Sequence, residues 1–389
     1  MNFILTEEQE ELLALVRKFS EKEILPYAHQ MDVEAHFVPG LIQKIADLGF
    51  MGINVPEEYG GVGADEVTKA LVIMEFAKYD ASVAELLAVH TLSSDIILKH
   101  GTPEQKEKYL TKACTGAVGA FALTEPNAGS DAAAAKTKAI VQGDEYIING
   151  SKCFISNMGQ DEGDYVILIV LTDPEKKTKG MSAIIVDRDT PGFTVPKTED
   201  KMGLRAAPVS ELYFDECHVP KSQLLGEEGK GFAIAMAGLD GGRIGMASQA
   251  VGLAESCIAE SVEYSTQRVQ FGKPVNANQG LQWYLADMAT KTEAAKALTL
   301  NAAALRQAGK NITKEAAMAK YYASETAVEV ANKALQIHGG YGYMKEYAIE
   351  RQYRDARIIP IYEGTSEVQK MVISRAVING KQLHCVKYI

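Results

Sequence analysis

The hydrophobic period changes twice along the chain, and this constrains the fold more than any other feature of the sequence. Apolar residues recur at helical spacing up to about residue 114, at strand-like spacing over the next hundred residues, and at helical spacing again from about Gly229. At 389 residues the chain also exceeds the size at which single cores stop growing. The sequence therefore predicts an α+β protein of three domains: a helical domain (1–114), a β domain (115–226) and a second helical domain (227–389).

Local signals within the two helical blocks predict where several helices begin. Thr6 and Gln9 have capping-box spacing, and Thr102 precedes a proline that suits the first position of a helix. Three long Ala-rich segments predict the helices of a bundle, and their apolar stripes fit packing between subunits and a purely internal core about equally well. These segments span residues 230–266, 279–308 and 314–338.

The middle block predicts a small β barrel or sandwich. Asn149 and Gly150 stand between two short apolar runs, which is the strongest short-range signal for a hairpin turn. Three further apolar runs, each bounded by turn residues, predict additional strands. They span residues 164–171, 181–186 and 209–214.

Composition and charge argue against several classes of protein. A net charge of −11 disfavours binding to nucleic acid or to an anionic membrane surface, because both need a basic patch. The N-terminus lacks the features of a signal peptide, and no window has the roughly 20 apolar residues of a membrane span. The five cysteines show no paired spacing and the seven histidines no ligand spacing, so we expect a cytoplasmic protein without disulfides or a metal site.

Glu363 is the strongest candidate for a catalytic base. It lies in an apolar turn between two helical patterns, next to Pro360, Ile361 and Tyr362. Burial there would raise the pKa of the carboxyl from its usual ~4.3 toward neutrality, where it can take a proton from carbon. The local pattern alone favours the alternative, an ordinary solvated charge at the end of a helix.

Two segments of the β block carry groups that suit the ring of a flavin. The loop 121–131 offers backbone amides and a threonine hydroxyl that could hydrogen-bond the ring. Phe154 and Ser156 share one face of a strand by alternation, so they could cover and contact the same ring. An ordinary turn cluster and the end of a core strand are the alternatives.

Three segments of the C-terminal block carry groups that suit the polar parts of a cofactor or substrate. Asp240 and Arg243 could pair with each other, bind a substrate group, or do both. Arg268 beside Phe271 could contact a phosphate and a nucleotide base, although a solvated loop is the usual interpretation. The glycine-rich segment 336–342 is a helix end that could admit a ligand to its backbone or serve only as a cap.

Taken together and in this order, these segments resemble the acyl-CoA dehydrogenase family from Leu5 to about Val377. The segment 123–131 is similar to one family signature, and 336–342 running into 354–365 is similar to a second. The resemblance implies an N-terminal helical domain, a middle β domain and a C-terminal four-helix bundle. It also implies FAD bound between the subunits of a homotetramer.

The resemblance further implies roles for individual residues. Glu363 would remove the α-proton of an acyl-CoA thioester while the β-hydrogen leaves as a hydride to the flavin, which yields the trans-2-enoyl-CoA. The residues that would bind FAD are Phe121, Leu123, Thr124, Phe154, Ser156, Arg268, Phe271, Gln279, Gln336, Gly339, Gly340, Thr365 and Glu367. Those that would contact the acyl-CoA are Ser130, Asp240, Arg243, Tyr362 and Gly364.

Finer features are most similar to the bacterial short-chain, butyryl-CoA-type members. Gly242 occupies the position at which some branched-chain and long-chain members carry the base, so we expect Glu363 to keep that role. The expected activity is FAD-dependent dehydrogenation of a short-chain acyl-CoA, with electrons passed to an electron-transferring flavoprotein. One alternative is an enoyl-CoA reductase that runs the same chemistry in reverse on an aryl-acrylyl or other acyl group, within an electron-bifurcating complex. An acyl-CoA oxidase and a non-catalytic assembly or binding protein are two others.

Overall fold

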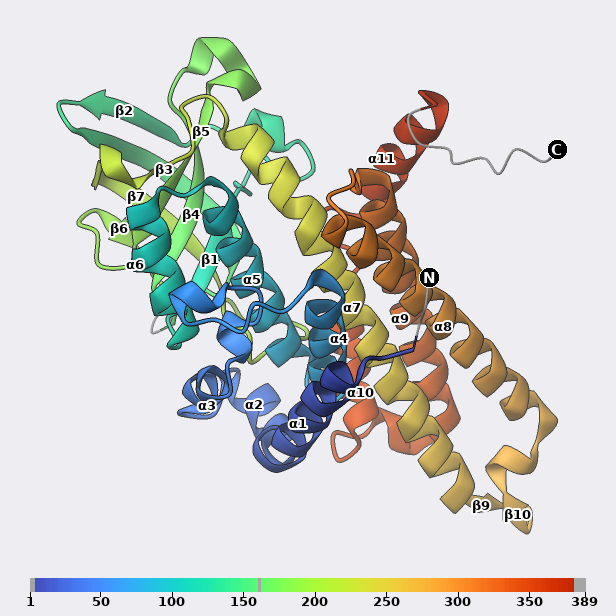
Figure 1. Ribbon diagram of the computed structural model, residues 1–389. Coiled ribbons are helices and arrows are strands. Elements are labelled where there is room, and N and C mark those ends of the chain that lie inside the picture. The colour runs from blue at the N-terminus through green and yellow to red at the C-terminus, as the bar shows by residue number, and fades with distance from the viewer. Residues whose placement is uncertain (1–3, 160–161, 381–389) are drawn as a thin grey trace.

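The computed structural model describes residues 4–159 and 162–380, and it has the predicted α, β and α blocks in order (Figure 1). The longer N-terminal helices are α1 (Glu7–Glu23), α2 (Ala28–Glu34), α3 (Leu41–Asp47), α4 (Glu66–Ala77), α5 (Ala81–His100) and α6 (Pro103–Cys114). The main sheet contains β1 (Gly119–Ala122), β2 (Lys138–Gln142), β3 (Glu145–Ser156), β4 (Tyr165–Leu171), β5 (Met181–Asp187), β6 (Phe193–Thr194), β7 (Val209–Pro220) and β8 (Leu224–Leu225). The C-terminal block contains α7 (Gly231–Gln267), β9 (Val269–Gln270), β10 (Lys273–Pro274), α8 (Gln279–Gln307), α9 (Thr313–His338), α10 (Ala348–Ala356) and α11 (Ser366–Ile378).

The helix starts predicted from local signals are confirmed. Thr6 caps α1 and Thr102 caps α6, each in a complete capping box, and Pro103 is the first residue of α6. The three Ala-rich segments form α7, α8 and α9, within about one residue of the predicted ends. The fold class is confirmed, whereas the domain limits at 114/115 and 226/227 stay predictions.

The middle domain is one sheet that is folded into two layers. Its strand order is β6-β7-β3-β2-β4-β5-β8, with β1 pairing beside β4. Among the described residues, the strand pairing that joins the two halves is that of Lys138 with Leu171, so the sheet can bend there. Side chains from β3 and β7 in one half and from β1, β4 and β5 in the other form a shared apolar core.

The predicted hairpin at Asn149 and Gly150 is wrong, because β3 runs straight through them. Gly150 has φ 147°, and a Cβ there would lie 2.6 Å from the Thr137 hydroxyl oxygen, so the glycine permits a close approach within a bulge against β7. The Asn149 side chain bonds both the backbone and the carboxylate of Glu216. The observed hairpin joins β2 to β3 around Gly143.

Helix α5 lies at the centre of the N-terminal domain, between α4, α6, α7 and β1. It is long and apolar enough to cross a membrane, but 89% of its apolar window is buried inside the protein. This apolarity is what a helix covered on all sides requires. Cys114, Cys153, Cys217 and Cys257 are buried free thiols, and Cys385 lies outside the described residues.

Helix α7 connects the parts of the molecule. It begins beside the sheet, passes α4 and α5 of the N-terminal domain, and continues along α8 and α9 to the β9–β10 hairpin (Figure 1). Glycines at 241, 242, 245 and 252 allow close packing along its middle, where a Cβ at each position would meet a neighbouring group within about 3 Å. This middle section of α7 forms one wall of the candidate active site.

Candidate active site

Side chains from α9 and α11 hold the turn between α10 and α11 by hydrogen bonds to its backbone. Glu363 has φ 53° and Gly364 has φ 91°, so both adopt left-handed backbone conformations. The Gln369 side-chain amide donates to the carbonyls of both residues, at 3.2 and 2.8 Å. Lys320 Nζ on α9 also donates to the Gly364 carbonyl, at 2.7 Å, and Thr365 caps the start of α11. The strained conformation of Glu363 is therefore imposed by its surroundings.

The carboxyl group of Glu363 has the environment of a general base. Burial raises its pKa to about 7, against the opposing effects of Arg243 and Lys320, and nearby Glu85 raises it further. The residue is partly accessible, yet its Oε2 is buried and has no hydrogen-bond partner within the described ranges. A Cβ built on Gly242 would lie 3.0 Å from this atom, so the carboxyl occupies space that any side chain at 242 would take.

Asp240 and Arg243 form the ion pair that the sequence left open, with 2.5 Å between Oδ1 and Nη1. Thr313 Oγ1 donates to the other carboxylate oxygen at 2.6 Å. Arg243 is buried, and in the described part of the chain its Nε has no acceptor. This donor remains available for an acceptor on a ligand.

Tyr362 connects the Glu363 turn to helix α7 by a hydrogen bond. Its hydroxyl donates to the side-chain oxygen of Gln249 on α7, and the Gln249 amide donates to the Ala81 carbonyl at the start of α5, at 2.7 Å. The turn, α7 and α5 are therefore connected directly. This chain of hydrogen bonds brings α5 into the site.

Glu85 on α5 is a second buried carboxyl group beside Glu363. Ser156 at the end of β3 donates its hydroxyl to Glu85 Oε1 at 2.7 Å. Burial raises the pKa of Glu85 to about 7, although Ser156 and Lys201 act in the opposite direction. The charge of Glu85 also raises the pKa of Glu363 and of Tyr362, so the three groups lie within electrostatic range of one another.

The loop after β1 and the end of β3 lie next to each other. The two segments must be adjacent if both are to contact one flavin ring, as the sequence suggested. Cys153 N donates to the Thr124 carbonyl and Lys152 Nζ to the Leu123 carbonyl, both at 3.0 Å. Phe154 has φ 57° and is 74% exposed, next to a bulge that interrupts regular alternation. Phe121 is half-buried on β1, and Ser130 is exposed in the loop.

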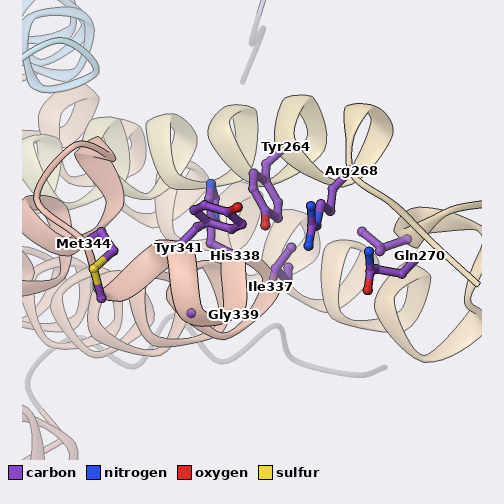
Figure 2. A pocket seen from close by; sticks show the side chains of 10 residues that line it. Tyr264, Arg268, Gln270, Ile337, His338, Gly339, Tyr341 and Met344 are labelled. Carbon is purple, nitrogen blue, oxygen red and sulfur yellow. The ribbon is translucent and has the colours of Figure 1, made fainter.

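A second group of predicted residues lies at the far end of α7, where a pocket of 510 Å³ opens (Figure 2). Arg268, Gly339 and Gly340 line it together with aromatic side chains. The guanidinium of Arg268 lies 5.3 Å from the centre of the Tyr341 ring. His338 and Tyr264 stack with 4.3 Å between ring centres, and the close-up shows these rings side by side.

The structure therefore separates the predicted residues into two groups. Arg243 and Arg268 stand at opposite ends of a helical segment about 38 Å long. Phe271, Gln279 and Gln336 are exposed near the second group and do not line its pocket. Among the other residues predicted to bind cofactor, Thr365 is engaged as a helix cap beside Glu363, and Glu367 is exposed on the first turn of α11.

Sequence reasoning missed the supporting residues of the turn and the second carboxyl. Lys320 and Gln369 hold the turn, Gln249 connects it to α5, and the charge of Glu85 raises the pKa of Glu363. The available signal was a charged residue inside an otherwise apolar helical pattern, since Glu85 and Lys320 both interrupt such patterns. Each needs a partner or a function when buried.

Comparison with known proteins agrees with this arrangement. Models of the acyl-CoA dehydrogenase N-terminal, middle and C-terminal domains match residues 6–117, 120–217 and 229–378. A protein of Anaerotignum propionicum named acryloyl-CoA reductase (NADH) is 53% identical over 97% of this chain and 96% of its own length. The chain belongs to the acyl-CoA dehydrogenase family.

Solved structures of the family superpose along nearly the whole chain. Butyryl-CoA dehydrogenase from Megasphaera elsdenii is 46% identical, with a TM-score of 0.94 and coverage of 97% of this chain and 100% of that one. A chain in the structure described as the electron-transferring flavoprotein of Acidaminococcus fermentans, from work on flavin-based electron bifurcation, has 46% identity, a TM-score of 0.95 and the same coverage. This acyl-CoA dehydrogenase therefore has close relatives among both dehydrogenases and reductases.

Proposed function

We propose that this protein is an FAD-dependent dehydrogenase of short-chain acyl-CoA thioesters, which forms the trans-2-enoyl-CoA. The observation that carries the proposal is the Glu363 carboxyl, which has a pKa near neutrality and lies against Gly242 of α7 in a turn held by hydrogen bonds. A base is most effective when its pKa lies near the working pH. Membership of the acyl-CoA dehydrogenase family supplies the reaction class.

The residues present fit FAD. The exposed ring of Phe154 and the hydroxyls of Thr124 and Ser156 suit an isoalloxazine ring and its polar edge, with Phe121 and Leu123 behind them. Arg268 and the exposed backbone at Gly339 and Gly340 suit the dinucleotide of an FAD held mainly by a second copy of the chain, with Phe271, Gln279 and Gln336 beside it. When bound, FAD supplies the hydride acceptor.

The chain's own groups handle the α-proton. Glu363 in its ionised form takes the proton from the α-carbon, and its partly accessible position lets a thioester reach it. Arg243 and Lys320 place positive charge near Glu363 and so keep part of the carboxyl ionised despite burial. The free Nε of Arg243 and the exposed Ser130 are the proposed donors to the acyl-CoA, with Tyr362 and Gly364 beside the thioester.

Replacing Glu363 by glutamine tests the proposal. Glu363→Gln should keep FAD bound but lose bleaching of the flavin by butyryl-CoA by several orders of magnitude, because no other carboxyl occupies its position. Glu57→Gln, which changes an exposed glutamate in the N-terminal domain, is the matched control and should bleach normally. Normal bleaching in Glu363→Gln, or a purified protein without flavin colour, would contradict the proposal.

The reverse reaction is the second candidate, and the 53% identity to a protein named acryloyl-CoA reductase favours it. Glu363 would then return a proton to the α-carbon, so the same side chain serves both directions. Rates should be measured with butyryl-CoA plus an artificial acceptor and with crotonyl-CoA or an aryl-acrylyl-CoA plus a reductant. A much larger rate in the second assay would assign the reductase.

The partners and the assembly are proposals of the same kind. We infer that electrons pass to or from an electron-transferring flavoprotein, as the relative described with that name suggests. We also propose a cytoplasmic homotetramer, since the second group of cofactor residues is exposed far from Glu363. Light scattering and copurification with the flavoprotein test these two statements directly.

A further inference from the structure

Glu85 is a buried carboxyl group whose hydrogen bonding is incomplete. The residue is 2% exposed near the start of α5. Its Oε1 accepts from Ser156, whereas its Oε2 is buried with no donor anywhere in the described segments. The nearest cationic influence comes from Lys201, which lies beyond ion-pair distance and bonds the Arg205 carbonyl at 3.4 Å.

Another buried carboxyl group, that of Glu125, has the hydrogen bonds expected of a purely structural role. Glu125 is also buried, in the loop after β1, but both of its oxygens are satisfied. Oε1 accepts from Lys152 Nζ at 2.8 Å and Thr137 N at 3.0 Å, and Oε2 accepts from Lys136 N at 2.6 Å. A buried acceptor without a donor destabilises the fold, so Glu85 keeps a group that structure alone would have paired or removed.

The position of Glu85 places it on the wall of the candidate active site. Ala81, one turn earlier on α5, accepts the hydrogen bond of Gln249, which holds Tyr362. Ala88, about one turn later, lies against Gly245 of α7, where a Cβ would be 3.1 Å from the Ala88 Cβ. Residues 81, 85 and 88 share one face of the helix, so Glu85 projects toward α7 and the Glu363 turn.

We propose that Glu85 is a specificity residue whose Oε2 accepts a hydrogen bond from a hydroxyl or ammonium group on the acyl chain, just beyond its β-carbon. The inference rests on the proposed function for the reaction itself, and it adds the class of substrate. Ser156 places Glu85 on the side where the flavin ring is proposed to lie, and Glu363 marks the α-carbon, so the next carbons of the chain pass Glu85. An acyl group with a terminal carboxylate is disfavoured, because it would add a third carboxyl beside Glu85 and Glu363.

The first experiment compares substrates that differ only at this position. We would measure kcat/KM for butyryl-CoA, 4-hydroxybutyryl-CoA and 4-aminobutyryl-CoA with the natural protein, Glu85→Leu and Glu85→Gln. The natural protein should prefer a donor-bearing acyl group to butyryl, and Glu85→Leu should lower that preference about 10- to 100-fold. Glu85→Gln retains an acceptor oxygen, so it should keep a preference for the hydroxyl and lose one for the ammonium.

A binding measurement separates this inference from the proposed function. Calorimetry with Glu363→Gln and with Glu363→Gln/Glu85→Leu reports the affinity for each acyl-CoA without turnover. The donor-bearing acyl-CoA should bind about tenfold or more weakly to the double variant, while the flavin absorbance and the melting temperature verify that both variants are folded. Equal substrate preferences and equal affinities with and without Glu85 would overturn the inference. Loss of all turnover in the natural protein, with the affinity difference intact, would overturn only the proposed function.

Discussion

The two groups of predicted residues differ in how completely one chain encloses them. Around Glu363, side chains from α7, α9 and α11 hold the turn by hydrogen bonds, and the Oε2 atom of Glu363 is buried. Around Arg268 the pocket is open, Phe271 is 100% exposed, and the glycines at 339 and 340 face outward. The first region is a site that a single chain encloses, whereas the second is an exposed surface of the kind that binds another molecule.

This difference separates chemistry from assembly. A change near Glu363 should affect the rate and its pH dependence while FAD stays bound. A change near Arg268 should affect retention of FAD while the chemistry of a loaded site remains. A single variant that altered both the rate and the retention of FAD would contradict this division.

After the loss of Glu363 itself, filling the space at Gly242 should have the largest effect. In Gly242→Val the new side chain would push the Glu363 carboxyl away, since even a Cβ would lie 3.0 Å from Oε2. A displacement of about 1 Å lowers rates roughly 100-fold, so kcat/KM for butyryl-CoA should fall by about that factor with FAD content unchanged. Gly280→Val, at a helical glycine with nothing within 4 Å of its Cβ, is the control. Equal activity of the two variants would show that the carboxyl does not need its place beside Gly242.

The sequence predicted those features that depend on nearby residues. Thr6 and Thr102 cap their helices through residues three positions away, and the ends of α7, α8 and α9 follow the apolar period of each segment. The prediction at Asn149 and Gly150 was wrong because the deciding contact is with Thr137, which lies just before β2 and is not local to the predicted turn. For Glu363, the apolar turn correctly indicated that the carboxyl is buried. The pKa of that carboxyl also depends on Arg243, Lys320 and Glu85, and no local pattern in the sequence places these residues near it.

The missed residues are those whose partners are distant in sequence. Glu85 and Ser156 are 71 residues apart, and Lys320 and Gly364 are 44 apart. Glu85 and Lys320 appeared in the sequence only as charged residues within helical patterns, and their partners could not be known before the elements were packed. The roles of the individual FAD and acyl-CoA residues stay predictions, although the loop after β1, the end of β3 and the Glu363 turn do come together around α5.

Removing Lys320 should affect the pH dependence of the same region. Lys320 lowers the pKa of Glu363, so Lys320→Met should raise that pKa above about 7 and reduce the ionised fraction at neutral pH. The variant also loses the bond to the Gly364 carbonyl. We expect kcat/KM near pH 7 to fall about 30-fold, with the acid limb of its pH profile shifted to higher pH.

The shift distinguishes electrostatics from simple loss of structure. Lys320→Arg should recover much of the activity and move the acid limb back, because it restores the charge. A fall in activity with no movement of the limb would mean that Lys320 acts only by holding the turn.

Arg268→Ala tests the open region, and its effect on a loaded site should be the smallest. Loss of one exposed cationic partner should weaken FAD binding about tenfold, seen as a lower ratio of flavin to protein absorbance after dilution. At saturating FAD the pH profile of kcat/KM should stay that of the natural protein, because Glu363 and Lys320 are unchanged.

If two chains complete one site, mixing Arg268→Ala with Glu363→Gln should form hybrids in which one site is intact, and the mixture should exceed the activity of either variant at limiting FAD. No gain on mixing, once exchange of subunits is verified, would mean that Arg268 acts within its own chain despite lying about 38 Å along α7 from Arg243.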